Sequence, residues 1–303
     1  MTTLNIKRPL PWIVGSATLV MVIIITVWLV PPHFVKTPYL EKKKFFTMNG
    51  AYALSLSDKK ELFVSDYRSN VKVFNLAGKV QRRFTVPGAN IRGIRVKPGS
   101  KQIYVADWKT EQIRILSPQG GQFLAFNGIT GMVPHGFLFL PNGQYLVSDN
   151  ANRGVMRFNA NNTFDKRFGK VGQKKKPGEL NRTRQLAYDS INKHVYVTDR
   201  DNNRIQIFDL QGRYIRGLGD TNSNGGHLKH PHGIALDLKN KRVYVSDTFN
   251  NRIVVYSLSG RYKSEYKEFK EPRWMAVDQS TGKLYVASHS EDEVGVFEVV
   301  WKW

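Results

Sequence analysis

The feature that most constrains this chain is a segment of strand-forming residues that recurs six times and usually ends in aspartate. The last residue of each copy is, in order, Asp66, Asp107, Asp149, Asp199, Asp247 and Ser288. Successive copies are 41, 42, 50, 48 and 41 residues apart. A period of this length is typical of one four-stranded β-sheet per repeat, so an array of six such sheets is expected.

The fifth repeat shows the strand pattern within one unit. Apolar and β-branched residues alternate in Lys241–Asp247 (KRVYVSD), and Arg252–Tyr256 (RIVVY) follows after a short loop. Gly260 indicates the next hairpin turn, which leads to an outer strand, and Gly233–Asp237 (GIALD) supplies an inner strand. No convincing amphipathic helix interrupts the series. We therefore expect an all-β, six-bladed β-propeller with four-stranded blades.

The ends of the repeat array indicate how the ring closes. The sixth unit has its third strand at Glu293–Val300, and the residues Trp301–Trp303 are too few for a fourth. The segment Glu41–Met48 (EKKKFFTM) aligns with the outer-strand sequence QRRFTV of the first unit. The N-terminal strand is therefore expected to complete the last blade, which removes its free edge. Such a strand enters from the face opposite to the one where the inner strands begin.

The N-terminal region predicts a membrane anchor. Residues Pro11–Val30 are twenty uncharged, mostly apolar residues, enough to cross a hydrocarbon core of about 30 Å as a helix. No small-residue cleavage site follows, which favours an uncleaved anchor over a signal peptide. The expected organisation is a tail at 1–10, a transmembrane helix at 11–30, a linker at 31–40 and the propeller at 41–303. The short tail favours a single-pass membrane protein whose propeller is extracytoplasmic.

The charge of the chain points to the kind of partner. The formal net charge is +22, of which only Lys7 and Arg8 precede the apolar segment. A body of this sign attracts acidic proteins, anionic lipids, acidic glycans or nucleic acid. The chain contains no cysteine, which excludes disulfides, thiolate metal sites and a cysteine nucleophile.

The residues that open the inner strands are the strongest candidates for a binding site. We expect them to line the central channel at one mouth, and in chain order they are Ala51, Arg92, His135, Arg184, His232 and Arg273. Three guanidinium groups at a narrow mouth suit carboxylate or phosphate oxygens, although each could instead pair with its own blade. A run of lysines lies in a long loop near the same mouth: Lys174, Lys175 and Lys176. The repeated aspartates are expected to be structural, because an aspartate that ends a strand can accept N–H bonds from the following loop.

The repeats resemble the NHL-repeat family, whose members form six-bladed β-propellers. The resemblance rests on PHGIALD (Pro231–Asp237), VYVSD (Val243–Asp247) and NNRI (Asn250–Ile253), with close copies in the fourth unit. Within this family the amidating lyases are similar at the channel, where they bind zinc through three histidines. His135 and His232 match two of these, but Ala51, with Tyr52 beside it, stands in the third place. The two histidines are therefore weak metal candidates, and no metal or other cofactor is expected.

These observations favour a binding function over catalysis. The expected function is a membrane-tethered scaffold that recruits an anionic or acidic macromolecule, a protein foremost, and serves as a subunit of a larger membrane complex. A metal-assisted lyase or hydrolase in the channel mouth is the alternative. RNA binding is a further alternative that requires a cytoplasmic propeller. Nucleic acid is less favoured because the sequence has no regular interleaving of aromatic and basic residues.

Overall fold

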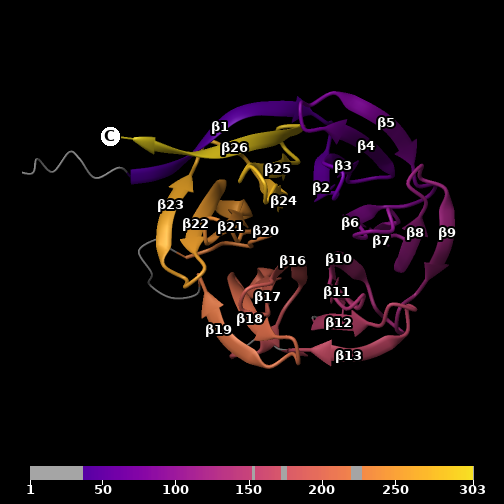
Figure 1. Ribbon diagram of the computed structural model, residues 1–303. Helices are drawn as coiled ribbons and strands as arrows, with labels where there is room; N and C mark the ends of the chain where they lie inside the picture. Colours follow the sequence, from indigo (N-terminus) through magenta and orange to yellow (C-terminus); the bar gives the residue numbers. More distant parts are fainter. Residues whose placement is uncertain (1–36, 152–153, 172–175, 220–226, 303) are drawn as a thin grey trace, which may run out of the picture. The chain divides into compact units, whose positions relative to one another are not determined.

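The computed structural model describes residues 37–151, 154–171, 176–219 and 227–302, and Tyr39–Val300 form one compact unit. Within this unit six antiparallel sheets of four strands stand around a common axis (Figure 1). The prediction of an all-β, six-bladed propeller with four-stranded blades is confirmed.

The first three blades follow one another in the chain, and each runs from the axis outward. Blade 1 contains β2 (Ala51–Leu56), β3 (Glu61–Asp66), β4 (Asn70–Asn75) and β5 (Val80–Thr85). Blade 2 contains β6 (Ile91–Val96), β7 (Ile103–Asp107), β8 (Gln112–Leu116) and β9 (Gln122–Phe126). Blade 3 contains β10 (Pro134–Phe139), β11 (Tyr145–Asp149), β12 (Gly154–Phe158) and β13 (Phe164–Phe168).

The next two blades are preceded by longer connections, which explains the steps of 50 and 48 residues. A short parallel pair, β14 (Lys170–Val171) and β15 (Glu179–Leu180), precedes blade 4. Blade 4 contains β16 (Thr183–Asp189), β17 (His194–Asp199), β18 (Arg204–Asp209) and β19 (Tyr214–Leu218). Blade 5 contains β20 (Ile234–Asp237), β21 (Arg242–Asp247), β22 (Arg252–Ser257) and β23 (Tyr262–Tyr266).

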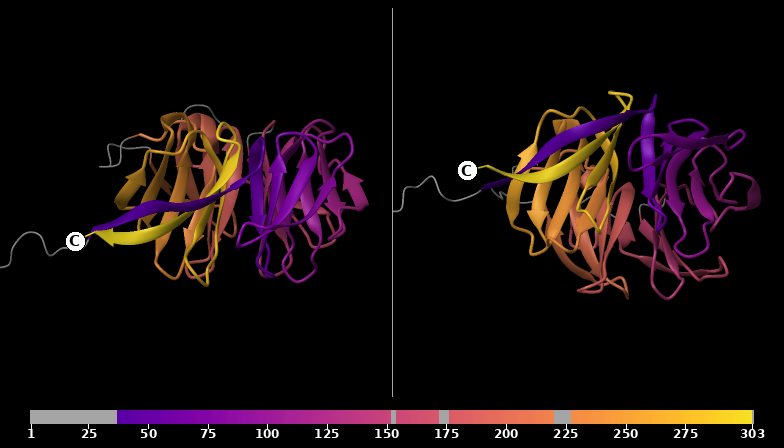
Figure 2. Two further views of the ribbon diagram at one scale, coloured as in Figure 1. Left: turned by 90° about the horizontal axis from the view of Figure 1, so that it is seen from above. Right: turned by 45° about the horizontal axis from the view of Figure 1, so that its top comes forward.

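The sixth blade joins the two ends of the repeat array. It contains β24 (Pro272–Val277), β25 (Leu284–Ser288), β26 (Glu293–Lys302) and, as its outer strand, β1 (Thr37–Thr47). Figure 2 shows β1 beside β26. Closure by the N-terminal strand is therefore confirmed, and the strand begins at Thr37, inside the segment expected to be a linker.

The predicted membrane anchor falls outside the part of the chain that the structure describes. Among the described residues, no helix has the length and apolar character needed to cross a membrane, and the segment Pro11–Val30 is not one of them. The anchor thus stays a prediction from the sequence.

The apolar core lies between neighbouring blades. One cluster joins Leu146 and Val155 of blade 3 to Leu186 and Val195 of blade 4, and all four side chains are buried. The other clusters likewise combine residues of adjacent blades. Each sheet therefore buries its two faces against the neighbouring blades, and closure of the ring buries the faces of all six sheets.

The repeated aspartates hold the loop that follows them and, in blades 2 to 5, also the loop that leads into the inner strand. Asp247 accepts bonds from the backbone N–H of Lys229 at 2.6 Å and from the side chains of Asn250 and Arg252 at 2.8 and 2.6 Å. The guanidinium of Arg252 also donates to the carbonyl of His227. Equivalent contacts surround the other four aspartates, whose carboxylates accept loop N–H groups. Their predicted structural role follows directly from these bonds.

The inner strands approach one another closely, and the glycine of β6 marks the tightest point. A Cβ atom added to Gly93 would lie 1.7 Å from the carbonyl oxygen of His135 in the next blade. We expect Gly93→Ala to lower the free energy of unfolding by about 3 kcal/mol, the upper range for an overpacked core, since a backbone atom obstructs the methyl group. Urea unfolding measures this value. Gly121→Ala is the control, because its nearest neighbour is 3.4 Å away, and equal stability of the two variants would contradict the packing.

Candidate functional site

A β-bulge at the start of the inner strands turns one side chain into the channel. In blade 2, Ile91 pairs with Asp107 and Gly93 pairs with Ala106, so Arg92 is the unpaired extra residue. A bulge of this kind re-aims a side chain. The same irregularity occurs in the inner strands of blades 1, 3, 4 and 6.

The bulge corrects one member of the predicted ring. In blade 1 it falls between Ala51 and Ala53, so Tyr52 occupies the channel position. Ala51 is fully buried and does not line the cavity. The sequence prediction was one residue out, because Tyr52 precedes Asp66 by 14 residues, whereas the channel residues of blades 2, 4, 5 and 6 precede the last residue of their repeat motif by 15.

The channel mouth is a cavity of about 550 Å³, which we call the arginine cup. Its lining residues are Tyr52, Tyr67, Arg92, Trp108, His135, Asn150, Arg182, Arg184, Arg200, His232, Arg273 and His289. All five predicted arginine and histidine positions are brought together in this cavity. The volume is in the range of small-molecule sites.

Sequence reasoning missed the outer part of this lining. Five of the additional residues directly follow the repeated aspartate or serine: Tyr67, Trp108, Asn150, Arg200 and His289. Arg182 directly precedes the inner strand of blade 4. The residue after each repeat motif was therefore the signal that could have revealed this second ring.

The arginine cup carries an excess of positive charge. Five of its twelve described lining residues are arginines, and none is acidic. Two carboxylates lie next to it: Asp201 contacts Arg182 and Arg200, and Glu271 contacts Arg273 at 3.1 Å. Five guanidinium groups against two carboxylates leave the site cationic at neutral pH.

Two of the guanidinium groups of the cup are held by neutral partners. The guanidinium carbon of Arg92 lies 3.4 Å from the ring centroid of Tyr67 and 4.9 Å from the ring centroid of Trp108. Arg184 donates to the side-chain oxygen of Asn150 at 2.6 Å. Burial lowers the pKa of Arg184 to about 10, so the group stays charged at neutral pH. Neither group forms an ion pair within the described chain, so their charges are available to an incoming anion.

Tyr52 joins two histidines at the centre of the cup. Its hydroxyl lies 3.1 Å from Nε2 of His232 and 3.4 Å from Nε2 of His135. Burial and the nearby arginines lower the pKa of both histidines well below the usual value, so both rings are neutral. The Nδ1 atoms of both rings have no hydrogen-bond partner among the described residues.

A floor of two side chains ends the cup. Gln185 of blade 4 bonds to the backbone N–H groups of Ile234 and Met275, in blades 5 and 6. Trp274 of blade 6 is 1% exposed and stacks on His135 of blade 3 with ring centroids 6.0 Å apart. These side chains cross the lumen beneath the mouth and form the floor of the arginine cup, which is open at the mouth.

Of the predicted lysine cluster, only Lys176 is among the described residues, and it does not line the cup. Lys174 and Lys175 lie outside the described residues. Lys176 is exposed, and its carbonyl accepts a bond of 2.8 Å from Arg204. Arg204 also donates to the carbonyl oxygen of Glu179, so it ties this loop to blade 4.

The residues present do not fit a catalytic zinc ion. Such a site needs three protein ligands and an open position. His135 and His232 offer two nitrogens, Tyr52 takes the third place, and the surrounding guanidinium groups repel a dication. Among the described residues, no group of three or more histidine, aspartate, glutamate or cysteine side chains could hold a metal.

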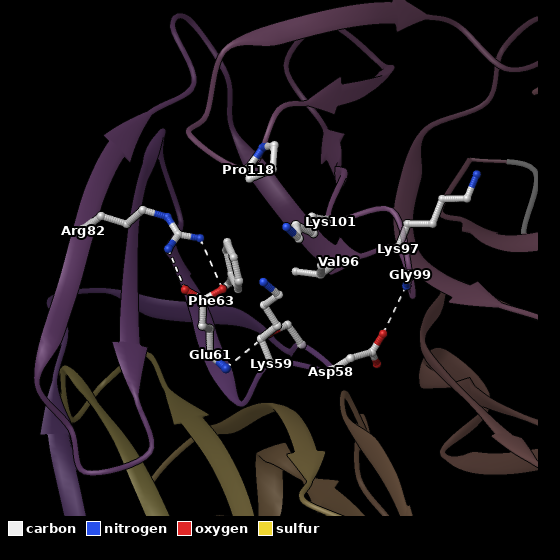
Figure 3. A pocket seen from close by; sticks show the side chains of 11 residues that line it. Asp58, Lys59, Glu61, Phe63, Arg82, Val96, Lys97, Gly99, Lys101 and Pro118 are labelled. Atoms are coloured by element: carbon white, nitrogen blue, oxygen red, sulfur yellow. Dashed lines mark hydrogen bonds and ion pairs between the residues drawn. The ribbon is translucent and has the colours of Figure 1, made fainter.

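A second, smaller pocket lies at the opposite face between blades 1 and 2 (Figure 3). It encloses about 120 Å³, and its acidic groups already have partners. Glu61 pairs with Arg82 at 2.6 Å, and Asp58 accepts the N–H of Gly99 at 3.1 Å. This pocket is too small for a drug-sized ligand.

Comparison with known proteins agrees with the fold. A protein family described as "6-bladed beta-propeller" matches residues 179–293. This is a six-bladed propeller. Its assignment to the NHL-repeat family in particular stays a prediction. Comparison with curated proteins gives no match.

Solved structures of the same architecture include enzymes. A streptogramin B lyase is 14% identical, with a TM-score of 0.62 over 89% of this chain and 100% of that one. Virginiamycin B lyase from Staphylococcus aureus, an inactive variant solved with quinupristin, is 16% identical with a TM-score of 0.61, over 86% and 88%. Hydrazine synthase from Kuenenia stuttgartiensis is 13% identical with a TM-score of 0.65, over 90% and 99%. At these identities the likeness shows the fold alone.

The neutral histidines make stability depend on pH. Their pKa is lower in the folded chain than in the unfolded one, so the unfolded state binds more protons as the pH falls below about 6.5. We expect the free energy of unfolding to fall by about 1 kcal/mol per histidine between pH 6.5 and 5.5. Urea titrations at several pH values measure this, and His135→Gln with His232→Gln should flatten the slope. An unchanged slope in the double variant would overturn the assignment.

Proposed function

We propose that this chain is a membrane-tethered, non-enzymatic binding module that captures an anionic or acidic partner, a protein foremost, in the arginine cup. The observation that carries this proposal is the charge of the cup. Five arginines line one cavity, and only Asp201 and Glu271 offset them among the described residues. Carboxylate or phosphate groups of a partner would restore the balance and accept bonds from the guanidinium forks.

The rim of the cup supports a macromolecular partner. Tyr67 and Trp108 flank Arg92 and are 39% and 44% exposed. Exposed aromatic rings beside arginine are enriched at the centres of protein interfaces. The cup would therefore hold an acidic side chain or terminus while the rim contacts the rest of the partner.

The direction of β1 supports a tether at the opposite face. The strand ends at Thr47, and β2 begins at Ala51 on the face that carries the cup. β1 therefore starts toward the other face, and a membrane span at Pro11–Val30 would lie on that side. In this proposal the propeller is extracytoplasmic, its cup points away from the lipid, and the chain acts as a subunit of a larger membrane complex.

Removal of the cup arginines tests the proposal. We expect Arg92→Gln, Arg184→Gln and Arg273→Gln together to abolish crosslinking of the full chain to its acidic partner in native membranes. In vitro, binding of poly-L-glutamate should weaken at least tenfold, because charged hydrogen bonds contribute about 1.5–3 kcal/mol each. Biolayer interferometry at fixed salt measures the affinity.

The matched control removes the same number of charges elsewhere. Lys79, Arg167 and Arg213 are exposed and do not line the cup. Their replacement by glutamine should change binding only slightly. Equal losses in the two triple variants would show that net charge alone drives binding, and retained binding in the cup variant would refute the proposal.

An enzyme is the second candidate, and one observation favours it. The Tyr52 hydroxyl lies between two neutral histidines, an arrangement that can move a proton. A lyase or hydrolase of this kind would use the same cup.

Metal analysis separates the two functions. We expect purified full-length protein to contain far less than one zinc ion per chain, because the third ligand position holds Tyr52. Mass spectrometry of the metal content measures this. Stoichiometric zinc that is lost in His135→Ala, but kept in His227→Ala, would favour the enzyme instead.

A further inference from the structure

The other end of the channel contains a separate cavity of about 560 Å³, which we call the Arg95 pocket. It lies beyond the floor formed by Gln185 and Trp274, at the face where the inner strands end. Its walls combine apolar side chains with polar and charged ones, and they come from the inner strands of all six blades. A cavity of this size is in the range of small-molecule sites.

Small residues create this space. The channel residues of blades 4, 5 and 6 are followed, three residues later, by Ala187, Ala235 and Ala276. All three line the pocket, and so does Leu138 at the equivalent place in blade 3. In blade 2 this place is taken by Arg95. The alanines leave room in front of one long cationic side chain.

Arg95 has no partner in the described chain. No hydrogen bond or ion pair joins its guanidinium to any described residue, although the side chain is partly buried. Burial lowers the pKa of Arg95, while the charge of Asp58 acts in the opposite direction. A partly buried guanidinium without a hydrogen-bond or ion-pair partner keeps its donors free, so a ligand carboxylate could accept bonds from it.

The other charged groups of the pocket are already engaged. Asp278 pairs with Lys60 and accepts bonds from Ser280. Asp58 accepts the N–H of Gly99. Arg95 is therefore the charged lining residue that has neither a hydrogen bond nor an ion pair among the described residues, while Asp58 keeps its negative charge in the same pocket.

We propose that the Arg95 pocket binds a small amphipathic carboxylate, with the carboxylate on Arg95 and the apolar body against the alanine and leucine walls. A guanidinium fork matches the two oxygens of a carboxylate. One unpaired guanidinium, with Asp58 and Asp278 in the same lining, favours a monoanion over a di- or triphosphate. This site is independent of the arginine cup, because the floor separates the two cavities.

Octanoate is the probe that tests this site. Full-length protein in phosphatidylcholine nanodiscs is titrated with octanoate by calorimetry, and empty nanodiscs provide the blank. We expect saturable binding of octanoate, and no binding of octanol, which lacks the charge. Arg95→Gln should weaken octanoate binding at least tenfold, as expected for the loss of a charged hydrogen bond. Arg213→Gln removes one exposed charge and should bind like the original chain.

A second variant locates the ligand without altering any charge. Ala276→Leu places a branched side chain in the pocket and should also weaken octanoate binding at least tenfold. Thermal unfolding of each variant shows whether it is folded, and Ala276→Leu decides the question if Arg95→Gln does not fold. The proposal is overturned if millimolar octanoate gives no saturable heat, or if both folded variants bind it as tightly as the original chain.

Discussion

The structure depends on the burial of each blade's faces against its neighbours. A four-stranded sheet of this size has two apolar faces and cannot hide both by itself. The side chains that fill the gaps are large: Tyr104, Tyr196, Tyr244 and Tyr285 each stand three residues before the last residue of a repeat motif and are at most 1% exposed. Closure of the ring is a consequence, because an open array would leave two apolar faces in water.

The same packing places the side chains that line both cavities at the propeller axis. The inner strands must approach closely, so glycines occupy the position after the channel residue in blades 2, 3 and 5, where Gly93, Gly136 and Gly233 lie against the next strand. The remaining space is filled by Gln185 and Trp274, which divide the lumen. Above this division arginine, histidine and aromatic side chains line the cup, and below it apolar and charged side chains, three alanines among them, line the Arg95 pocket. One scaffold thus carries two cavities with different linings.

The sequence predicted the fold well because its signals are local and repeated. The motif spacing gave the blade number, and the unpaired third strand at Glu293–Val300 indicated closure by the N-terminus. The mouth residues were found in five of six blades, and Tyr52 was missed because it lies one residue nearer to its repeat aspartate than most of the equivalent residues do. Arg182 was missed because a loop brings it to the cup, and loop paths leave little pattern in a sequence. Arg200 directly follows a repeat aspartate, and this signal was not used. The isolation of Arg95 could not be foreseen, because it depends on which neighbours lack a partner for it.

The closing strand also determines the order in which the protein can assemble. β1 is the first described strand to leave the ribosome, and β26, its partner, is the last. Until synthesis ends, the side chain of Leu40, which is 3% exposed in the ring and packs with residues of blades 5 and 6, has no blade to cover it. During translation this segment therefore stays unpaired. A chaperone or the translocation machinery would have to prevent it from pairing with other strands or aggregating.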